Sequence, residues 1–443
     1  MQDLITPLLE YTLFAILIVV IFFMINNRYQ VILVLLLISP LITEIYYFIS
    51  SNYTYERESI FSYVRVMVLC LCGVAGYYHL LKARKSAKIE IALELKIYFV
   101  FAFLAIVSII YSINTYFTFI RSFCLIALMG ILFGLYAWLN SERRHLSMIN
   151  ILFYVSVIIL FVNIISAILF QGKAWLMDTT LRFRGLFTQP NTFGSFCMVS
   201  YPAMFWTYMH SRSFRKIAIF VTILVMIIFH IASGSRGSFI SSLIMGILWL
   251  IIRKKSKVIA ISFFFMIILA VLFQIRTNSL DTFIRNVPYE NRFMTLTGRV
   301  EIWTESINLI VKRPFLGYGY DITAKIFDSP FALYKNANLA WLAKSNQSFH
   351  NGYITTALGL GFVGLSIWSF LLFSPPLRLI KRANKEFVLV PFSIMISCLI
   401  LNFTEYSINP GSSLSSIFFW LAWTLSLRII QIDKRSRWEP ATP

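Results

Sequence analysis

The sequence predicts an all-α integral membrane protein that crosses the bilayer many times. Hydrophobic residues make up 58% of the 443 residues and charged residues only 13%, with a mean hydropathy of +0.76. A soluble domain of this size carries about twice that share of charged residues. The apolar residues also fall into separate runs, many close to the roughly twenty residues that a helix needs to span a bilayer. Together these three observations exclude a soluble globular domain.

The apolar runs predict thirteen membrane-spanning helices, give or take one. If residues 8–49 are partly re-entrant the number is twelve, and the side on which the chain starts stays open. Three regions follow: ten helices in 1–274, a long polar loop with helices of its own in 275–351, and three helices with a tail in 352–443. The expected spans are 8–26, 31–49, 60–81, 97–113, 117–138, 148–170, 192–209, 216–233, 237–252, 257–274, 352–373, 387–404 and 412–428.

Positive charge gives these helices an orientation. Most of the 39 Lys and Arg residues lie in alternate connections, such as 82–96, 253–257 and 378–385, and cytoplasmic loops carry such an excess. The net charge of +20 is therefore explained by topology, and nucleic acid is not expected as a partner. The other connections, including 171–191, 234–236, 275–351 and 405–411, are predicted to face outside.

No cofactor or metal ion is expected from the sequence. All five cysteines fall within predicted spans and are interpreted as small apolar residues. No phosphate-binding glycine loop, nucleophile elbow or HExxH motif occurs. The acids of the outer connections include no closely spaced pair such as Asp-x-Asp, and they are Asp178, Asp281, Glu290, Glu301, Glu305, Asp321, Asp328 and Glu405.

The candidate general base is His350, in Ser348-Phe349-His350-Asn351, at the start of an expected span. Ser348 or Asn351 can cap the free amides of that helix. The positive end of the helix dipole disfavours a charged imidazolium, and a neutral imidazole is what the deprotonation of a hydroxyl group requires. Of the other four histidines, only His230 is also expected on the outer side. A lone interfacial histidine is more often structural, so the interpretation depends on its neighbours.

Those neighbours are arginines from three outer segments. Arg236 lies in a Ser-Gly-Ser-Arg-Gly-Ser turn, Arg182 and Arg184 precede Asn191, and Arg299 lies in the long loop. Guanidinium groups bind phosphate oxygens in a bidentate way and remain charged at working pH. A single arginine in such a segment is typical of an interfacial side chain. Several arginines at the outer ends of neighbouring helices predict that the protein binds an anionic head group such as a diphosphate.

Within the long loop, residues 298–311 are predicted to form an amphipathic helix that lies at the membrane surface. An Arg-Pro-Phe-Leu-Gly-Tyr-Gly-Tyr stretch, residues 313–320, then ends it.

At these residues the sequence resembles the bacterial O-antigen ligase and O-antigen polymerase family. His350-Asn351, nine residues and then Gly361-Phe362-Val363-Gly364 are similar to the ligases' pattern of His, then Asn, Ser or Gln, nine residues, and Gly-x-x-Gly. Arg236 looks like the family's first essential arginine. Arg299, followed by Trp303 and the turn at 317–319, looks like the second. Arg184 with Asn191 resembles a further, less specific segment, and the resemblance covers about residues 180–375.

The resemblance implies a GT-C-like glycosyltransferase in the bacterial cytoplasmic (inner) membrane with its active site on the periplasmic face. The donor would be an undecaprenyl-diphosphate-linked glycan, the acceptor a glycan or lipid A core, and membrane lipid would surround the protein. Transfer would be metal-independent and inverting. His350 would be the base, Arg236 and Arg299 would hold the diphosphate, and the binding residues would be Arg184, Arg182, Asn191, Asn351 and His230.

Two alternatives stay open at this point. The acceptor distinguishes a ligase, a polymerase and a protein oligosaccharyltransferase, and these residues do not name it, although nothing marks a peptide-binding domain. The second alternative is a transporter or flippase of a lipid-linked glycan. It predicts charged residues deep in the spans, for which the candidates are Arg65, Arg121 and Glu44.

Overall fold

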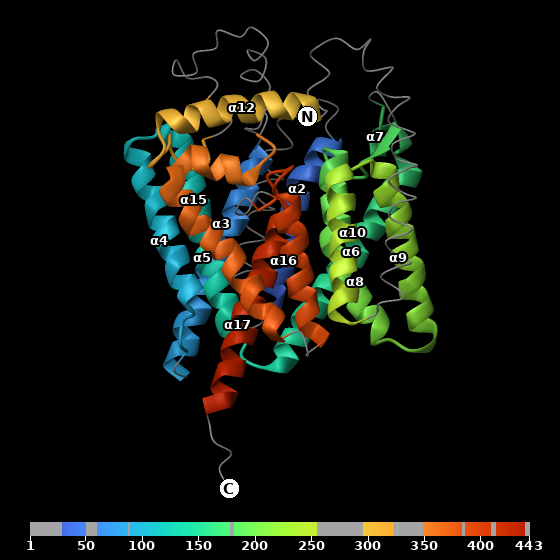
Figure 1. The fold of residues 1–443 in the computed structure, drawn as a ribbon. Coiled ribbons are helices and arrows are strands. Elements are labelled where there is room, and N and C mark those ends of the chain that lie inside the picture. The colour runs from blue at the N-terminus through green and yellow to red at the C-terminus, as the bar shows by residue number, and fades with distance from the viewer. Residues whose placement is uncertain are drawn as a thin grey trace.

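The chain folds into a bundle of long helices with one helix, α12, lying across one end (Figure 1). The structure is a computed structural model. It describes residues 29–49, 60–86, 89–177, 181–254, 296–322, 326, 349–382, 386–408 and 413–438. The long helices are α2 (Tyr29–Ile49), α3 (Ile60–Ser86), α4 (Leu93–Val107), α5 (Thr115–Trp138), α6 (Glu142–Leu169), α8 (Pro190–Met209), α9 (Ser213–Ser233), α10 (Arg236–Ile252), α12 (Leu296–Lys312), α15 (Gly352–Leu379), α16 (Leu389–Leu401) and α17 (Leu414–Trp438).

The predicted fold class is confirmed. Eleven of the thirteen expected spans coincide with a helix, while 8–26 and 257–274 lie outside the described residues. Among the described residues, seven helices are long and apolar enough to cross a membrane, and three further apolar helices are shorter. The structure adds one feature that was not predicted. After the short helix α7 (Gln171–Ala174), strands β1 (Trp175–Met177) and β2 (Leu181–Phe183) form an antiparallel hairpin that pairs Trp175 with Phe183.

Connections that were predicted to share a side lie at the same end of the bundle. At the α12 end, Ile113 donates its backbone N–H to Tyr318 O over 3.1 Å. At the other end, Glu386 binds both Arg253 after α10 and His210 after α8. The alternation of charge along the sequence is therefore matched by the alternation of helix ends in space.

α12 and the segment that follows it are fixed on the end of α15 by a kink. Gly361, inside α15, has φ 65° and ψ −166°, so the helical hydrogen bonds are interrupted there. The freed carbonyls of Leu358 and Gly359 accept the N–H groups of Tyr318 and Gly319 over 3.0 and 2.9 Å. The N–H of Phe362 donates to Pro314 O over 2.7 Å. The kink thus exchanges helical bonds for bonds to 314–319, which keeps buried polar groups satisfied.

Apolar contacts complete this attachment. Ile302, Leu309 and Ile310 of α12 are buried in one cluster with Phe349 and with Ala357 and Leu358 of α15. The predicted helix of the long loop is confirmed, and the face that it buries is directed at the start of α15. The residue that precedes His350 is therefore part of a packed core.

Gly361→Ala should destabilise the protein by about 2–5 kcal/mol. The backbone conformation at residue 361 is restricted to glycine, and a Cβ there would lie 2.2 Å from the carbonyl of Phe315. The measurement is the apparent melting temperature in detergent, with Gly246→Ala as control because a Cβ at residue 246 meets nothing within 4 Å. Equal melting temperatures for the two variants would contradict the proposed tight junction.

Candidate active site

His350 stands at the start of α15 with both of its neighbours fixed. Asn351 is the N-cap of α15, and its side-chain oxygen accepts the N–H groups of Tyr353 and Ile354, each over 3.0 Å. Of the two residues predicted to cap this helix, Asn351 does so, and Ser348 lies outside the described residues. Trp303 of α12 donates its indole N–H to Phe349 O over 2.9 Å. Between these anchors His350 has φ 49°, which is uncommon for a residue with a side chain.

The imidazole of His350 contacts a carboxylate from the far end of the chain. His350 Nδ1 lies 2.9 Å from Glu405 Oε2, just after α16. Glu405 reaches it because the end of α16 is bonded to the start of α15. Gly352 donates its N–H to Asn402 O over 2.9 Å, and Asn351 Nδ2 donates to Phe403 O over 3.1 Å.

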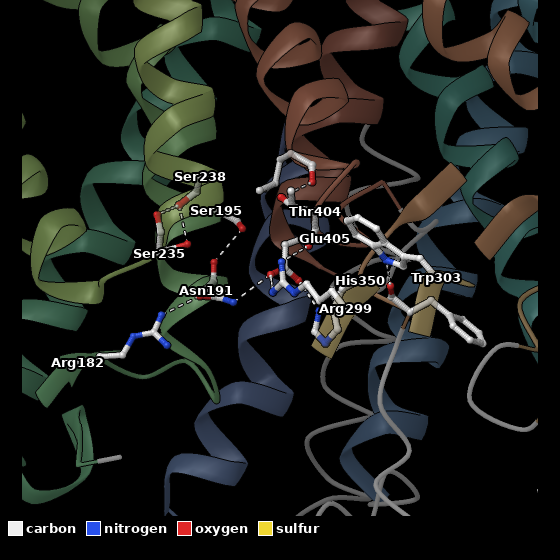
Figure 2. A network of polar contacts seen from close by, with 12 residues as sticks. Arg182, Asn191, Ser195, Ser235, Ser238, Arg299, Trp303, His350, Thr404 and Glu405 are labelled. Atoms are coloured by element: carbon white, nitrogen blue, oxygen red, sulfur yellow. Dashed lines mark hydrogen bonds and ion pairs between the residues drawn. The ribbon is translucent and has the colours of Figure 1, made fainter. Parts of the chain in front are cut away.

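Glu405 is the centre of a polar network (Figure 2). Its Oε1 accepts hydrogen bonds from Arg299 over 2.8 Å and from Asn191 Nδ2 over 3.0 Å. Arg299, in the first turns of α12, also donates to Thr404 O over 2.7 Å. The side chains of Arg299, His350 and Glu405 are 14%, 19% and 19% exposed, so the group is largely buried but keeps some contact with the surroundings.

The ionised carboxylate of Glu405 sets the tautomer that a neutral imidazole of His350 adopts. Burial alone would raise the pKa of the Glu405 carboxyl, but the hydrogen bond from His350 and the guanidinium of Arg299 outweigh it and hold that pKa below its ordinary value. An ionised carboxylate only accepts hydrogen bonds, so Nδ1 of His350 carries the proton. When the imidazole is neutral, Nε2 is then the lone-pair nitrogen, and a carboxylate behind an imidazole stabilises the imidazolium that forms when it takes a proton.

Arg182 extends the network toward α9. It donates to Asn191 Oδ1 over 2.8 Å and to Ser233 O over 2.9 Å. Arg182 is on β2, and these two hydrogen bonds place its side chain between Asn191 at the start of α8 and Ser233 at the end of α9. Two predicted binding residues, Arg182 and Asn191, are thereby connected to Glu405.

Arg236 opens α10 beside this network. The next residue, Gly237, packs against Thr404, since a Cβ at residue 237 would lie 2.7 Å from Thr404 Oγ1. Thr404 is also the residue whose carbonyl accepts from Arg299. The side chain of Arg236 is exposed.

The two remaining predicted residues have other surroundings. Arg184 is only 3% exposed and donates to the backbone carbonyls of Lys173 and Thr188 over 2.8 and 3.2 Å. His230 is 1% exposed inside the bundle, between α8 and α10. Neither has a hydrogen bond to Glu405 among those found for the described residues.

Sequence reasoning missed the part played by Glu405. It appeared only as one of several outer acids without an acidic neighbour. The available signal was its place, directly after a span on the side predicted for His350. Among the described residues, no three His, Cys, Asp or Glu side chains gather in a group that could hold a metal ion. The positive groups that the site offers to an anion are guanidinium groups.

Comparison with protein-family models identifies a family for part of the chain. Residues 198–369 match the family model described as O-antigen ligase. No curated protein matches the chain. The matched range contains Arg236, Arg299, Trp303, His350 and the glycine at the kink of α15. The resemblance seen in the sequence is thereby confirmed, and the chain is a multi-pass membrane protein whose residues 198–369 match the O-antigen ligase family.

Proposed function

We propose that the protein transfers a saccharide from a polyprenyl-diphosphate carrier to a hydroxyl group of an acceptor glycan at the outer face of the bacterial inner membrane. The observation that supports this most directly is the contact of His350, Glu405 and Arg299. In this contact His350 is the proton acceptor, Glu405 is the carboxylate that orients it, and Arg299 is the cation that binds phosphate. The three residues come from separate segments of the chain.

In this proposal His350 Nε2 removes the proton of the acceptor hydroxyl. The acceptor oxygen bonds to the anomeric carbon from the side opposite the diphosphate, which inverts that centre. The bond from the carbon to the diphosphate oxygen breaks, and the polyprenyl diphosphate leaves with the electron pair. Guanidinium groups directed at the growing negative charge lower the barrier without a metal ion.

Arg299 and Arg236 are assigned to the diphosphate. A guanidinium has five N–H donors, and Thr404 and Glu405 engage one on each of two Arg299 nitrogens. Within the described part of the chain, no partner is found for its other donors. Arg182 lies on β2 and binds the carbonyl of Ser233 in the turn that precedes Arg236, so we assign it the assisting part. Arg184 is assigned to bracing the 173–188 connection.

The transporter alternative receives less support. Of its three charged candidates, Arg121 pairs with Asp321 across 3.4 Å at the α12 end of α5. Glu44 accepts the N–H of Thr188 over 2.6 Å near the end of α2. Both therefore bind segments at one end of the bundle, where a transport path would need charges along its length.

The function is tested with the purified full chain in nanodiscs, supplied with an undecaprenyl-diphosphate-linked oligosaccharide and either lipid A core or a second lipid-linked repeat. Loss of donor together with a new, inverted glycosidic linkage is the expected result, and it should persist in EDTA. Donor that stays intact with both acceptors, while it moves across vesicle membranes that contain the protein, would favour the transporter.

Arg299→Lys should weaken donor binding by about ten- to a hundredfold. Lysine keeps the charge, but its three donors share one nitrogen, so it cannot hold Thr404 and Glu405 as Arg299 does and also bind a phosphate in a bidentate way. A hydrogen bond to a charged group contributes about 1.5–3 kcal/mol. The measurement is the affinity for undecaprenyl diphosphate. Arg313→Lys is the matched control, because Arg313 lies over the ring of Tyr318 at 4.9 Å on the same connection. Unchanged affinity in both variants would remove Arg299 from diphosphate recognition.

A further inference from the structure

The buried histidine of α9 lies in a hydrogen-bond chain that crosses three helices. His230 Nδ1 is 3.1 Å from the hydroxyl of Tyr201 on α8, and its Nε2 is 2.9 Å from Ser238 Oγ on α10. Ser238 Oγ in turn reaches Ser235 Oγ over 2.7 Å and donates to Ser235 O over 3.1 Å. Ser235 is the N-cap of α10, and Arg236 follows it.

The directions of these bonds make His230 a neutral linker. The hydroxyl proton of Ser238 is directed at Ser235, so Ser238 Oγ accepts the proton of His230 Nε2. Nδ1 of His230 is then the acceptor for the hydroxyl of Tyr201. Both ring nitrogens have a partner with one proton on the imidazole, and the side chain is 1% exposed. It has no access to a substrate hydroxyl, which excludes it as a second base.

The chain ends in the turn that carries Arg236. Ser233 Oγ donates to His230 O over 2.6 Å and accepts the N–H of Ser235 over 3.2 Å. Gly234 between them has φ 62°, the left-handed conformation that closes α9. The carbonyl of Ser233 accepts from Arg182. The turn is thus held from the bundle side by His230 and from the network side by Arg182.

Packing alone does not account for an imidazole at this place. Leucine or phenylalanine would fill a similar volume with no polar atom to satisfy, and a buried polar group is costly unless its bonds are made. Gly194 of α8 leaves room for the chain, because a Cβ there would lie 2.4 Å from Ser235 and 2.5 Å from Ser238 Oγ. The polar atoms of three helices are therefore arranged around the turn.

We propose that His230 is a positioning residue, which holds Arg236 toward the donor diphosphate through Ser238 and Ser235. This inference rests on the proposed function, in which Arg236 binds that diphosphate. It also replaces the direct substrate contact that was expected for His230.

The test is a mutant cycle with Arg236, read out as affinity for undecaprenyl diphosphate and as the KM and kcat of transfer. His230→Leu should weaken diphosphate binding and raise the KM for donor by about tenfold, the value of one lost buried hydrogen bond of about 1.4 kcal/mol. His230→Gln retains a donor near the place of Nε2 and should stay within about threefold of wild type. In the Arg236→Ala background, His230→Leu should add no more than about twofold.

Ser238→Ala is a second, independent variant that breaks the same connection. It removes the hydroxyl group that accepts the hydrogen bond from His230 Nε2, with little change in side-chain volume. It should reproduce the effect of His230→Leu and be absorbed in the same way by Arg236→Ala. Tyr201→Phe removes only the contact on the far side of the ring and should stay within about threefold.

The outcomes separate the two proposals. If His230→Leu and Ser238→Ala multiply the loss caused by Arg236→Ala, the chain only stabilises the bundle and the inference fails while the function stands. If both variants bind and transfer like wild type, the inference also fails alone. If Arg236→Ala binds and transfers normally, or if wild type binds no undecaprenyl diphosphate, the proposed function of Arg236 is wrong. The inference about His230 is then wrong as well.

Discussion

Replacing His350 with alanine should lower transfer by about 10²–10⁴-fold, the usual contribution of general base catalysis, while undecaprenyl diphosphate still binds. In the proposed mechanism the donor is held by guanidinium groups, and the imidazole is needed only when the acceptor proton leaves. The measurement is single-turnover transfer in nanodiscs, alongside donor affinity. Free imidazole should restore part of the rate, because it can take the proton from the space left by the side chain.

His210→Ala is the matched control for this prediction. His210 also follows a helix end, where it binds Glu386 at the opposite end of the bundle, so its loss should leave transfer near the wild-type rate. Transfer by His350→Ala at more than about a tenth of the wild-type rate would contradict the assignment of the base. A large loss that imidazole does not restore, together with weaker donor binding, would indicate a structural role.

Glu405→Gln should cost about as much as the loss of the base itself. Glu405 presents one oxygen to His350 and the other to Arg299 and Asn191, and all three partners are donors. Glutamine has a single oxygen, so its amide N–H₂ group must face a donor in either orientation. If it faces His350, Nδ1 becomes the acceptor and Nε2 carries the proton, which is the wrong tautomer for a base. Such a tautomer error lowers kcat by about 10⁴-fold in a serine protease triad.

Glu405→Asp is the informative companion variant. It keeps the charge and both oxygens but shortens the reach, so transfer should lie between that of wild type and Glu405→Gln. If Glu405→Gln transfers normally, the carboxylate does not set the tautomer of His350.

The pH dependence of stability follows from the lowered pKa of Glu405. A carboxyl group whose folded pKa lies below its unfolded value stabilises the protein above the unfolded pKa, about 4.3, and loses that effect as pH falls through the folded value. The difference in melting temperature between wild type and Glu405→Gln should therefore shrink as pH falls below about 4. A difference that already shrinks near pH 6 would mean that the carboxyl is protonated under working conditions.

The helices of this protein were predictable because the bilayer imposes one local rule. A membrane-spanning segment must form its backbone hydrogen bonds within itself and present apolar side chains to lipid. Each run of about twenty apolar residues therefore predicts a helix. The ends of α5, α9 and α10 lie within a few residues of their predicted places. The hairpin at Trp175–Phe183 was not predicted, because strands of three residues give no readable alternation.

The candidate base and its arginines were also accessible from sequence, since chemistry limits which side chains can do the work. His350 was distinguished by its place at a helix mouth, and Arg236 and Arg299 by outer segments with turn-forming glycines. Asn351 as a cap followed from its position before a helix. The parts assigned to Arg184 and His230 could not be derived, because burial decides whether a polar side chain meets a ligand or the backbone.

What the sequence determined alone was the number of apolar segments, their alternating orientation and the types of residue that could perform transfer, because each is set by composition over a short window. Only the tertiary structure decided that Glu405 joins them. It meets residues 55, 106 and 214 positions away along the chain, and no local pattern encodes contacts of that range. The kink at Gly361 and the bonded ends of α15 and α16 create that meeting point, since they fix His350, Arg299 and Glu405 in one place.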